Sequence, residues 1–352
     1  MNAVYHAPRW LPGGQLQTIW PALGARRVAG PPIRYRRERW DTPDGDFVDV
    51  DWLLDDTAAA QAAPAAPGNP RKAYASRSSQ PLLVLFHGLE GSSRSHYAQA
   101  LAGWARAQGV ALAVPHFRGC SGTINRAPRA YHCGDFTEIG WLLQRFHAAQ
   151  QARGGGPLLA VGVSLGGNAL LRWAGEAGAE AARTVQAVAG VCAPLDMAAS
   201  GHAIGRGFNR QVYTRMFLRT MKAKARAKLA QYPGLFDAQR LAAARDLYEF
   251  DDLFTAPLHG FAGVDDYWRR GSAKPHLGAV HVPALVLNAR NDPFVPAASL
   301  PRADEVSRHV TLWQPAQGGH VGFAEGRWPP GDVHWLPEAV GGWLLAAAGL
   351  GA

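Results

Sequence analysis

Short apolar runs alternate with longer amphipathic segments over most of this 352-residue chain. Six apolar runs have the length of buried strands, at 82–87, 111–115, 158–163, 185–192, 284–288 and 309–314. Helical patterns lie between or after them, at 95–108, 135–151, 165–178 and 336–348. Continuous apolar runs separated by helices are typical of parallel strands that are buried on both faces. The pattern therefore predicts an α/β fold with a mostly parallel central sheet and helices on both faces.

The first 80 residues follow other patterns. Residues 1–30 are apolar and rich in turn residues, and we expect an ordered arm that packs on the body. Two runs at 33–40 and 47–54, separated by Asp44 and Gly45, predict a hairpin at an antiparallel sheet edge. Residues 55–80 are rich in Ala, Pro, Ser and Arg, a composition that predicts a flexible loop. The part at 57–80 is longer than expected, and we expect it to be dispensable.

The alternation of strands and helices stops between residues 192 and 284. Residues 199–273 read as largely helical and basic, and we expect a helical cap over the functional site. The predicted organisation is an N-terminal arm, hairpin and loop at 1–80, a core in two parts at 81–198 and 274–352, and the cap between them.

Composition places the chain among folded globular proteins, with 47% hydrophobic and 18% charged residues. No apolar run reaches the roughly 18 residues that a membrane span needs, and the N-terminus lacks the basic and apolar regions of a signal peptide. Three cysteines (Cys120, Cys133 and Cys192) form neither a zinc pattern nor a disulfide framework. We therefore expect a cytoplasmic protein without a metal site.

A net charge of +9 is concentrated in one segment. Between Met197 and Phe236 there is no acidic residue, and eight basic residues are interleaved with apolar ones: Arg206, Arg210, Arg215, Arg219, Lys222, Lys224, Arg226 and Lys228. The favoured interpretation is a solvated helix face above the apolar roof of a pocket. A peripheral contact between this basic cap and an anionic membrane stays open as the alternative. No recognisable motif supports binding to nucleic acid.

The segment Gly162-Val163-Ser164-Leu165-Gly166 lies between a predicted strand and a predicted helix. A Gly-x-Ser-x-Gly turn in that context exposes the serine hydroxyl, and the glycines let strand and helix approach closely. We interpret Ser164 as a nucleophile. Among 40 glycines, a chance Gly/Ser turn is the competing interpretation.

A serine nucleophile needs a base and a group that orients the base. Asp292 follows the strand predicted at 284–288, and His320 lies in a glycine-rich loop after the next strand. We expect Asp292 to hold His320, and His320 to act as general base. An Asx turn before Pro293 is the competing interpretation of Asp292.

Two backbone N–H groups are candidates for an oxyanion hole. One is that of Leu89, in the Gly-rich turn after the strand at 82–87, and the other is that of Leu165, directly after the nucleophile. His87 is expected to shape this turn, and Glu90 to be a loop acid facing solvent. The paired acids at 251–252 and 265–266 are expected at helix ends or in ion pairs.

Taken together, these segments resemble the α/β-hydrolase fold, and more narrowly the YheT-like family, which is related to the ABHD1–3 group of serine hydrolases. The resemblance covers nearly the whole chain and rests on residues 11–20, 87–93, 117–122, 162–166, 291–294 and 318–323. It implies a serine esterase with Ser164, Asp292 and His320 as its charge-relay set. Asn291 departs from the family pattern, in which a second Asp is common.

The resulting hypothesis is a serine carboxylic-ester hydrolase that forms an acyl-enzyme and needs no cofactor. Its expected substrates are short- to medium-chain esters or acylglycerol-like molecules. The alternatives are an acyltransferase or membrane-lipid lipase with the same triad, and a non-catalytic binding scaffold.

Overall fold

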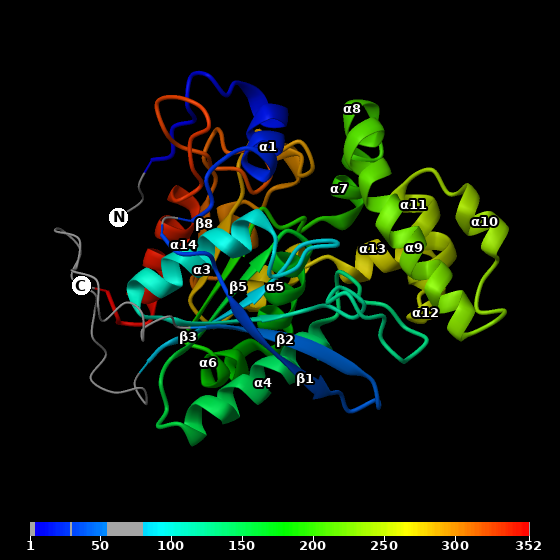
Figure 1. Ribbon diagram of the computed structural model, residues 1–352, viewed down its shortest axis with the longest axis horizontal. Helices are drawn as coiled ribbons and strands as arrows, with labels where there is room; N and C mark the ends of the chain where they lie inside the picture. The colour runs from blue at the N-terminus through cyan, green and yellow to red at the C-terminus, as the bar shows by residue number, and fades with distance from the viewer. Residues whose placement is uncertain (1–3, 29, 55–79, 352) are drawn as a thin grey trace.

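The chain forms one eight-stranded sheet flanked by helices (Figure 1). This computed structural model describes residues 4–28, 30–54 and 80–351. The strands lie in the order β1-β2-β4-β3-β5-β6-β7-β8. Their bounds are β1 (Tyr35–Asp41), β2 (Phe47–Leu53), β3 (Leu82–Phe86), β4 (Ala111–Pro115), β5 (Leu158–Val163), β6 (Ala187–Val191), β7 (Ala284–Leu287) and β8 (Val310–Trp313).

The six strands from β3 to β8 run parallel, and the β1–β2 hairpin adds an antiparallel edge through β2 and β4. The chain order reverses beside β3, because β4 pairs on one side of it and β5 on the other. Such a switch point leaves a crevice at the carboxyl ends of the strands, where ligands of open α/β sheets bind. The predicted fold class and the six predicted parallel strands are confirmed, with ends shifted by at most two residues.

Alternate side chains of the central strands face opposite layers of helices. Leu83 and Leu85 of β3 pack with α3 (His96–Gln108) and α14 (Trp335–Ala347). Leu82, Val84 and Phe86 pack on the other face with α4 (Phe136–Ala152) and α5 (Leu165–Ala177). Both faces of β3 are buried, which explains why the strands appear in the sequence as continuous apolar runs.

An N-terminal arm packs across the carboxyl-end side of the sheet and contains α1 (Gly13–Leu23). Its start is held by Tyr5, which is buried and donates a hydrogen bond of 2.7 Å to the Ala324 carbonyl. The expected hairpin follows it. The predicted 57–80 loop lies outside the described residues, apart from Gln80.

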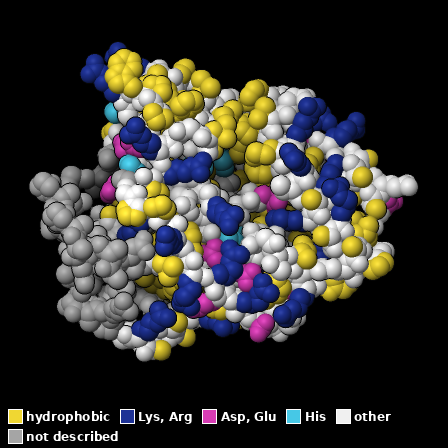
Figure 2. Space-filling view, in the orientation of Figure 1, with side chains coloured by type: hydrophobic (Ala, Val, Ile, Leu, Met, Phe, Trp, Pro, Cys, Tyr) yellow, Lys and Arg dark blue, Asp and Glu magenta, His cyan; other side chains and the backbone are white. Residues whose placement is uncertain are grey.

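A group of helices follows β6 and lies to one side of the sheet (Figure 1). We call it the helical insertion: α7 (Met197–Ile204), α8 (Gly207–Asn209), the π-helical turn η3 (Arg210–Thr214), α9 (Arg215–Gln231), α10 (Ala238–Ala243), α11 (Leu247–Phe250), the π-helical turn η4 (Asp251–Thr255), α12 (Ala256–Leu258) and α13 (Val264–Gly271). Lys and Arg side chains gather on its surface (Figure 2). The division into a core and a cap domain at 199–273 stays a prediction.

The remaining short helices connect these parts: η2 (Gly178–Glu180), α6 (Ala181–Thr184), η5 (Lys274–Ala279), η6 (Ala297–Ser299) and η7 (Ala303–Glu305). Among the described residues, no helix combines the length and the apolar character that a bilayer span requires.

Candidate active site

Ser164 occupies a sharp turn between β5 and α5, with φ 53° and ψ −120°. A non-glycine residue rarely adopts a positive φ, so this backbone is strained. The turn depends on its glycines: a Cβ on Gly162 would lie 2.3 Å from the Gly166 carbonyl oxygen, and one on Gly166 would lie 2.4 Å from the Phe86 carbonyl oxygen. The serine hydroxyl is therefore presented at the end of the strand by a backbone that only this glycine pattern permits.

His320 and Asp292 meet Ser164 at this turn. The Oγ atom of Ser164 lies 2.9 Å from Nε2 of His320, and Nδ1 of His320 lies 2.8 Å from Oδ2 of Asp292. The three residues come from the loops after β5, β7 and β8, and thus from the carboxyl ends of three parallel strands within the sheet order β5-β6-β7-β8. The geometry brings together the three residues that the sequence analysis singled out as nucleophile, base and orienting acid.

Asp292 forms an Asx turn and also contacts His320, so both interpretations of its sequence position hold in the structure. Its Oδ1 atom accepts hydrogen bonds from the backbone N–H of Phe294, at 2.7 Å, and of Val295, at 3.2 Å. Its Oδ2 atom faces His320. A carboxylate that accepts from Nδ1–H leaves Nε2 of the neutral ring as an acceptor for the serine hydroxyl, which is the tautomer that a general base needs.

Leu89 and Leu165 border Ser164 from two sides. A Cβ on Gly88 would lie 3.2 Å from the Cβ of Ser164, so the loop after β3 passes directly beside the serine. Within the described part of the chain, neither the backbone N–H of Leu89 nor that of Leu165 donates a hydrogen bond to a protein group. Two unpaired donors next to a serine hydroxyl can accommodate an oxyanion.

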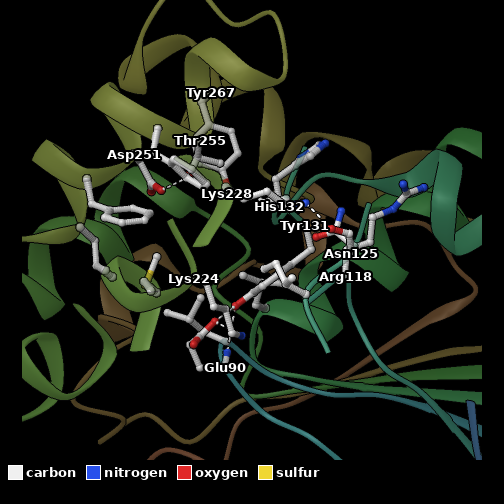
Figure 3. A pocket seen from close by; sticks show the side chains of 18 of the residues that line it. Glu90, Arg118, Asn125, Tyr131, His132, Lys224, Lys228, Asp251, Thr255 and Tyr267 are labelled. Atoms are coloured by element: carbon white, nitrogen blue, oxygen red, sulfur yellow. Dashed lines mark hydrogen bonds and ion pairs between the residues drawn. The ribbon is translucent and has the colours of Figure 1, made fainter. Parts of the chain in front are cut away.

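A cavity of about 80 Å³ opens beside these two leucines, between the loops of the sheet and the helical insertion (Figure 3). Glu90 and Lys224 lie at one end of the view, and Asp251, Thr255 and Tyr267 lie at the other. The apolar part of the lining comes from both sides: Leu89, Ile124, Ala130, Leu165, Met197, Met221, Leu247, Phe250 and Phe254.

Glu90 does not face solvent, and that expectation is wrong. Its side chain is 8% exposed, and its carboxylate accepts hydrogen bonds of 2.7 Å from the Tyr131 hydroxyl and from Lys224 Nζ. Tyr131 also accepts from the Glu90 backbone N–H, and Glu90 has a positive φ of 56°. Lys224 comes from α9, so the helical insertion itself covers the loop that carries Leu89.

The basic segment thus has an inner face as well as an outer one. Lys228, one turn after Lys224, is buried and donates to the carbonyl oxygens of Asn125 and Ala127 and to the side chain of Gln231. The spacing of four between these two lysines is the sequence signal for a shared helix face. The favoured interpretation of the segment as a solvated face is therefore wrong for these two lysines.

Asp251 lies at a helix end, as expected, because α11 ends before it and η4 begins with it. It is buried, however, and has no basic partner among the described side chains. It accepts from the Thr255 hydroxyl at 2.7 Å and from Trp268 Nε1 at 2.9 Å. Burial raises the pKa of this carboxyl to about 6. Asp266, in contrast, does pair with Arg269 and Arg270.

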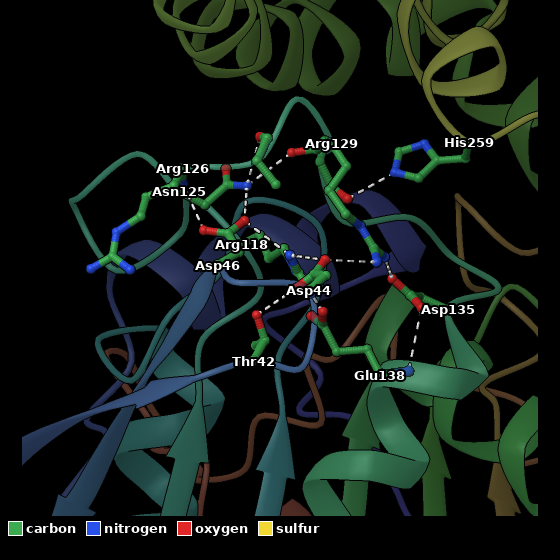
Figure 4. A network of polar contacts seen from close by, with 12 residues as sticks. Thr42, Asp44, Asp46, Arg118, Asn125, Arg126, Arg129, Asp135, Glu138 and His259 are labelled. Carbon is green, nitrogen blue, oxygen red and sulfur yellow. Dashed lines mark hydrogen bonds and ion pairs between the residues drawn. The ribbon is translucent and has the colours of Figure 1, made fainter. Parts of the chain in front are cut away.

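A buried polar network supports the loop that contributes Asn125 and Tyr131 to the cavity (Figure 4). At its centre, the Arg118 guanidinium donates to Asp46 at 2.9 Å and to Glu138 at 2.6 Å. Asn125 donates to the same Asp46 at 2.6 Å. The turn of the N-terminal hairpin therefore fixes one wall of the cavity, because Asp46 lies between β1 and β2.

The N-terminal helix contacts the loops of both Asp292 and His320, which the sequence analysis did not anticipate. The buried Gln17 side chain accepts at Oε1 from Asn291 Nδ2 and from the Gly318 backbone N–H, both at 2.9 Å. Thr18 Oγ1 accepts from the His320 backbone N–H at 2.9 Å. The sequence signal was the motif at 11–20, for which no role had been assigned.

Cys192, Asp292 and His320 hold three donor atoms of types that bind metals within 4.8 Å of one another. Two of these donors are already engaged, because Nδ1 of His320 faces Asp292 and Sγ of Cys192 accepts from the Val321 backbone N–H at 3.3 Å. Burial raises the pKa of the Cys192 thiol, which disfavours the thiolate that a metal requires. The donor set fits an oriented base better than a metal site.

Comparison with known proteins places this geometry in context. The family described as alpha/beta hydrolase fold matches residues 81–327. The chain is 38% identical over 331 residues to "Putative esterase YheT" of Escherichia coli, covering 94% of this chain and 89% of that protein. It is 28% identical over 300 residues to phospholipase ABHD3 of Mus musculus, covering 85% and 69%. The solved esterase Pf2001 of Pyrococcus furiosus has the same fold, with a TM-score of 0.51, 13% identity and coverage of 93% and 98%.

Proposed function

The chain belongs to the alpha/beta hydrolase family, and from this premise we propose that it is a serine carboxylic-ester hydrolase whose triad is Ser164, His320 and Asp292. The observation that carries the proposal is the continuous hydrogen-bond path from Ser164 Oγ through the ring of His320 to Asp292 Oδ2. The esterase and phospholipase names of the relatives agree with an enzyme of the ester-hydrolysing type.

In the first half-reaction, Ser164 Oγ attacks the ester carbonyl carbon while Nε2 of His320 takes the hydroxyl proton. The resulting imidazolium is stabilised by Asp292. The His320 imidazolium then gives the proton to the oxygen of the leaving alcohol as the C–O bond of the ester breaks. The acyl group remains on Ser164 as an ester.

The negative charge of the tetrahedral intermediate needs donors that are in position before the reaction. We assign this role to the backbone N–H groups of Leu89 and Leu165, which have no protein acceptor among the described residues and flank the serine. In the second half-reaction, His320 deprotonates a water molecule whose oxygen attacks the acyl carbon. The bond between that carbon and Ser164 Oγ then breaks, His320 returns the proton to Oγ, and the acid product leaves. This sequence of steps uses side chains and backbone alone.

The substrate class follows from the cavity beside Leu89 and Leu165. On the measure by which roughly 10–15 Å³ holds one water molecule, this cavity has about 80 Å³ and thus has room for a small organic group. Its apolar lining favours an acyl group over a polar one. The phospholipase name of the mouse relative extends the proposal to acylglycerol-like esters.

Acyl transfer on the same triad is the competing function, because an alcohol can replace water in the second half-reaction. Product analysis in the presence of a competing alcohol separates the two: a transferase yields mainly the new ester, and a hydrolase yields mainly the free acid. A non-catalytic scaffold is disfavoured by the hydrogen bond between Ser164 and His320, and would fail to react with a fluorophosphonate.

The decisive experiment measures hydrolysis of p-nitrophenyl esters from acetate to palmitate by the wild type and by Ser164→Ala. We expect an optimum at short or medium chains and a loss of roughly 10⁴-fold or more in kcat for the variant. Undiminished activity of Ser164→Ala would refute the triad. Labelling of the wild type by a fluorophosphonate without turnover of any of these esters would retain the triad and refute the substrate class.

A further inference from the structure

The outer side of the helical insertion exposes large apolar side chains. Phe208 is 52% exposed, Val212 is 38% exposed and Met216 is 55% exposed. They are spaced by four residues along the contiguous helical segment formed by α8, η3 and the start of α9. The sequence pattern predicted that the apolar residues of this segment form the roof of a pocket. That is so for Met221, which lines the cavity, but not for these three.

Basic side chains line a surface groove beside this apolar strip. The groove is lined by Arg210, Gln211, Arg215, Leu218, Arg219, Lys222, Arg226, Ala244 and Arg245, and no acidic residue is among them. Within the described residues, Arg210, Arg215, Arg219 and Arg226 form no ion pair. Figure 2 shows hydrophobic side chains and Lys and Arg side chains next to one another over this part of the molecule. We call the two together the α8–α9 surface.

The α8–α9 surface borders the candidate active site through a series of aromatic contacts. The ring of Phe208 lies 6.1 Å from that of Tyr213, and Tyr213 lies 4.5 Å from Phe294. Phe294 in turn lies 4.3 Å from the imidazole of His320. Three ring contacts therefore connect the exposed apolar strip with the proposed general base.

We propose that the α8–α9 surface docks on an anionic lipid bilayer. The basic groove complements the phosphate and carboxylate groups of anionic lipids, and Phe208, Val212 and Met216 insert at the boundary between head groups and acyl chains. A nucleic acid would satisfy the arginines, but its phosphate backbone offers the exposed apolar strip no apolar surface to bury against. The combination of the two features favours the bilayer.

Docking in this orientation holds the candidate active site close to the bilayer. The exposed strip is connected with His320 through the buried rings of Tyr213 and Phe294, so a lipid ester that leaves the bilayer has only a short distance to travel to Ser164. This consequence rests on the proposed function, whereas the docking itself does not.

Vesicle co-sedimentation of the full chain tests the docking without any substrate. We expect the wild type to bind vesicles that contain phosphatidylglycerol, to bind pure phosphatidylcholine vesicles only weakly, and to be released by salt. The triple variant Arg215→Gln, Arg219→Gln, Arg226→Gln should bind the anionic vesicles on the order of a hundredfold less well, since each basic residue near such a surface contributes roughly fivefold.

A matched control removes the same charge elsewhere. Arg9, Arg34 and Arg308 are exposed, lie outside the helical insertion and form no ion pair with a described acid. Their triple Gln variant should bind the anionic vesicles nearly as well as the wild type. Equal loss in both triple variants would reduce the effect to net charge and overturn the proposal, as would absence of binding by the wild type.

The double variant Phe208→Ser, Met216→Ser tests the apolar strip. It should bind less well at every lipid composition while keeping its salt dependence. Light scattering of the wild type and of this variant tests whether a second copy of the chain binds the α8–α9 surface instead. If the wild type were a dimer and the double variant a monomer, the surface would be a dimer interface and the proposal would be overturned. All variants should hydrolyse soluble short-chain esters like the wild type, and a general failure of hydrolysis would count against the proposed function only.

Discussion

The side chains of Gln17 and Asn291 are joined by a hydrogen bond of 2.9 Å, which connects the N-terminal helix with the loop that carries Asp292. The same Oε1 atom of Gln17 accepts from the backbone of Gly318, two residues before His320. One buried oxygen therefore fixes the spacing between the loops of the proposed acid and the proposed base. Gln17 lies outside the part of the chain matched by the hydrolase family, residues 81–327, whereas Asn291 and Gly318 lie within it.

Replacing Gln17 should lower kcat more than it changes KM. In Gln17→Ala, the N–H groups of Asn291 and Gly318 lose their acceptor, and the two loops drift relative to each other. A displacement of about 1 Å in such a site costs on the order of a hundredfold in rate. Steady-state kinetics and the rate of fluorophosphonate labelling measure this loss.

The control for Gln17 is Gln15, which lies on the same helix but hydrogen-bonds Asn209 and Tyr213 of the helical insertion. Gln15→Ala should keep the labelling rate of the wild type. If both variants lost activity in parallel with their thermal stability, Gln17 would serve the fold and not the spacing of the loops.

We expect the Thr18 hydroxyl to orient His320, because it accepts a hydrogen bond from the His320 backbone N–H. Thr18→Val keeps the shape of the side chain but leaves that N–H unpaired, which costs roughly 1–3 kcal/mol where the group is buried. We expect a clear fall in kcat, and its rescue in Thr18→Ser. Equal kcat for the valine and serine variants would show that the hydroxyl does not orient His320.

Asp292→Asn should abolish most of the activity while preserving the fold. The amide oxygen of asparagine still accepts from the backbone of Phe294 and Val295, which stabilises the turn. Its NH₂ group, however, cannot accept from Nδ1–H and favours the wrong tautomer of His320, at a cost of about 10⁴-fold in kcat. A small loss of kcat at an unchanged unfolding temperature would contradict the proposed role of Asp292.

The ion pair between Lys224 and Glu90 should couple the helical insertion to the loop of Leu89. Lys224→Met leaves a mostly buried carboxylate without its cation, so it should destabilise the protein and lower kcat more than the double variant Lys224→Met, Glu90→Gln does. A double-mutant cycle on unfolding free energy and on kcat measures the coupling. Strict additivity of the two substitutions would mean that the insertion does not act on this loop.

Because the pKa of the Asp251 carboxyl is raised, we expect the free energy of unfolding to depend on pH. The folded pKa of this carboxyl is raised to about 6 by burial, from an ordinary value of 3.8. The folded state therefore binds this proton more tightly than the unfolded state does, and the free energy of unfolding should fall as the pH rises from about 4 to above 6. The loss is on the order of 3 kcal/mol when complete.

Asp251→Asn removes this titration. Denaturant unfolding of wild type and variant at several pH values should show a difference that grows in favour of the variant between about pH 4 and pH 7. A difference that does not vary with pH would show that the Asp251 carboxyl ionises at its ordinary pKa.

The sheet could be predicted from the sequence because its strands are buried on both faces and stand out as apolar runs. The triad residues could be located for the same reason: Ser164, Asp292 and His320 each follow one of those strands, and the carboxyl ends of parallel strands share one edge. No comparable rule places Glu90, whose burial depends on Lys224, a residue 134 positions later in the chain. The contacts of Gln17 escape prediction likewise, because 301 positions separate it from Gly318 and nothing periodic connects them.

The cavity is assembled from two parts of the chain with different structural constraints. The loops after β3 and β5 are fixed by backbone packing around glycines, whereas Met221, Leu247, Phe250 and Phe254 come from the helical insertion. Exchanging the insertion between relatives would therefore change one wall of the cavity, whereas the loops that carry Leu89 and Ser164 would keep the geometry that their own glycines impose. Such a chimaera must carry a partner for Glu90, because a graft lacking Lys224 would leave a mostly buried carboxylate without its cation next to Leu89.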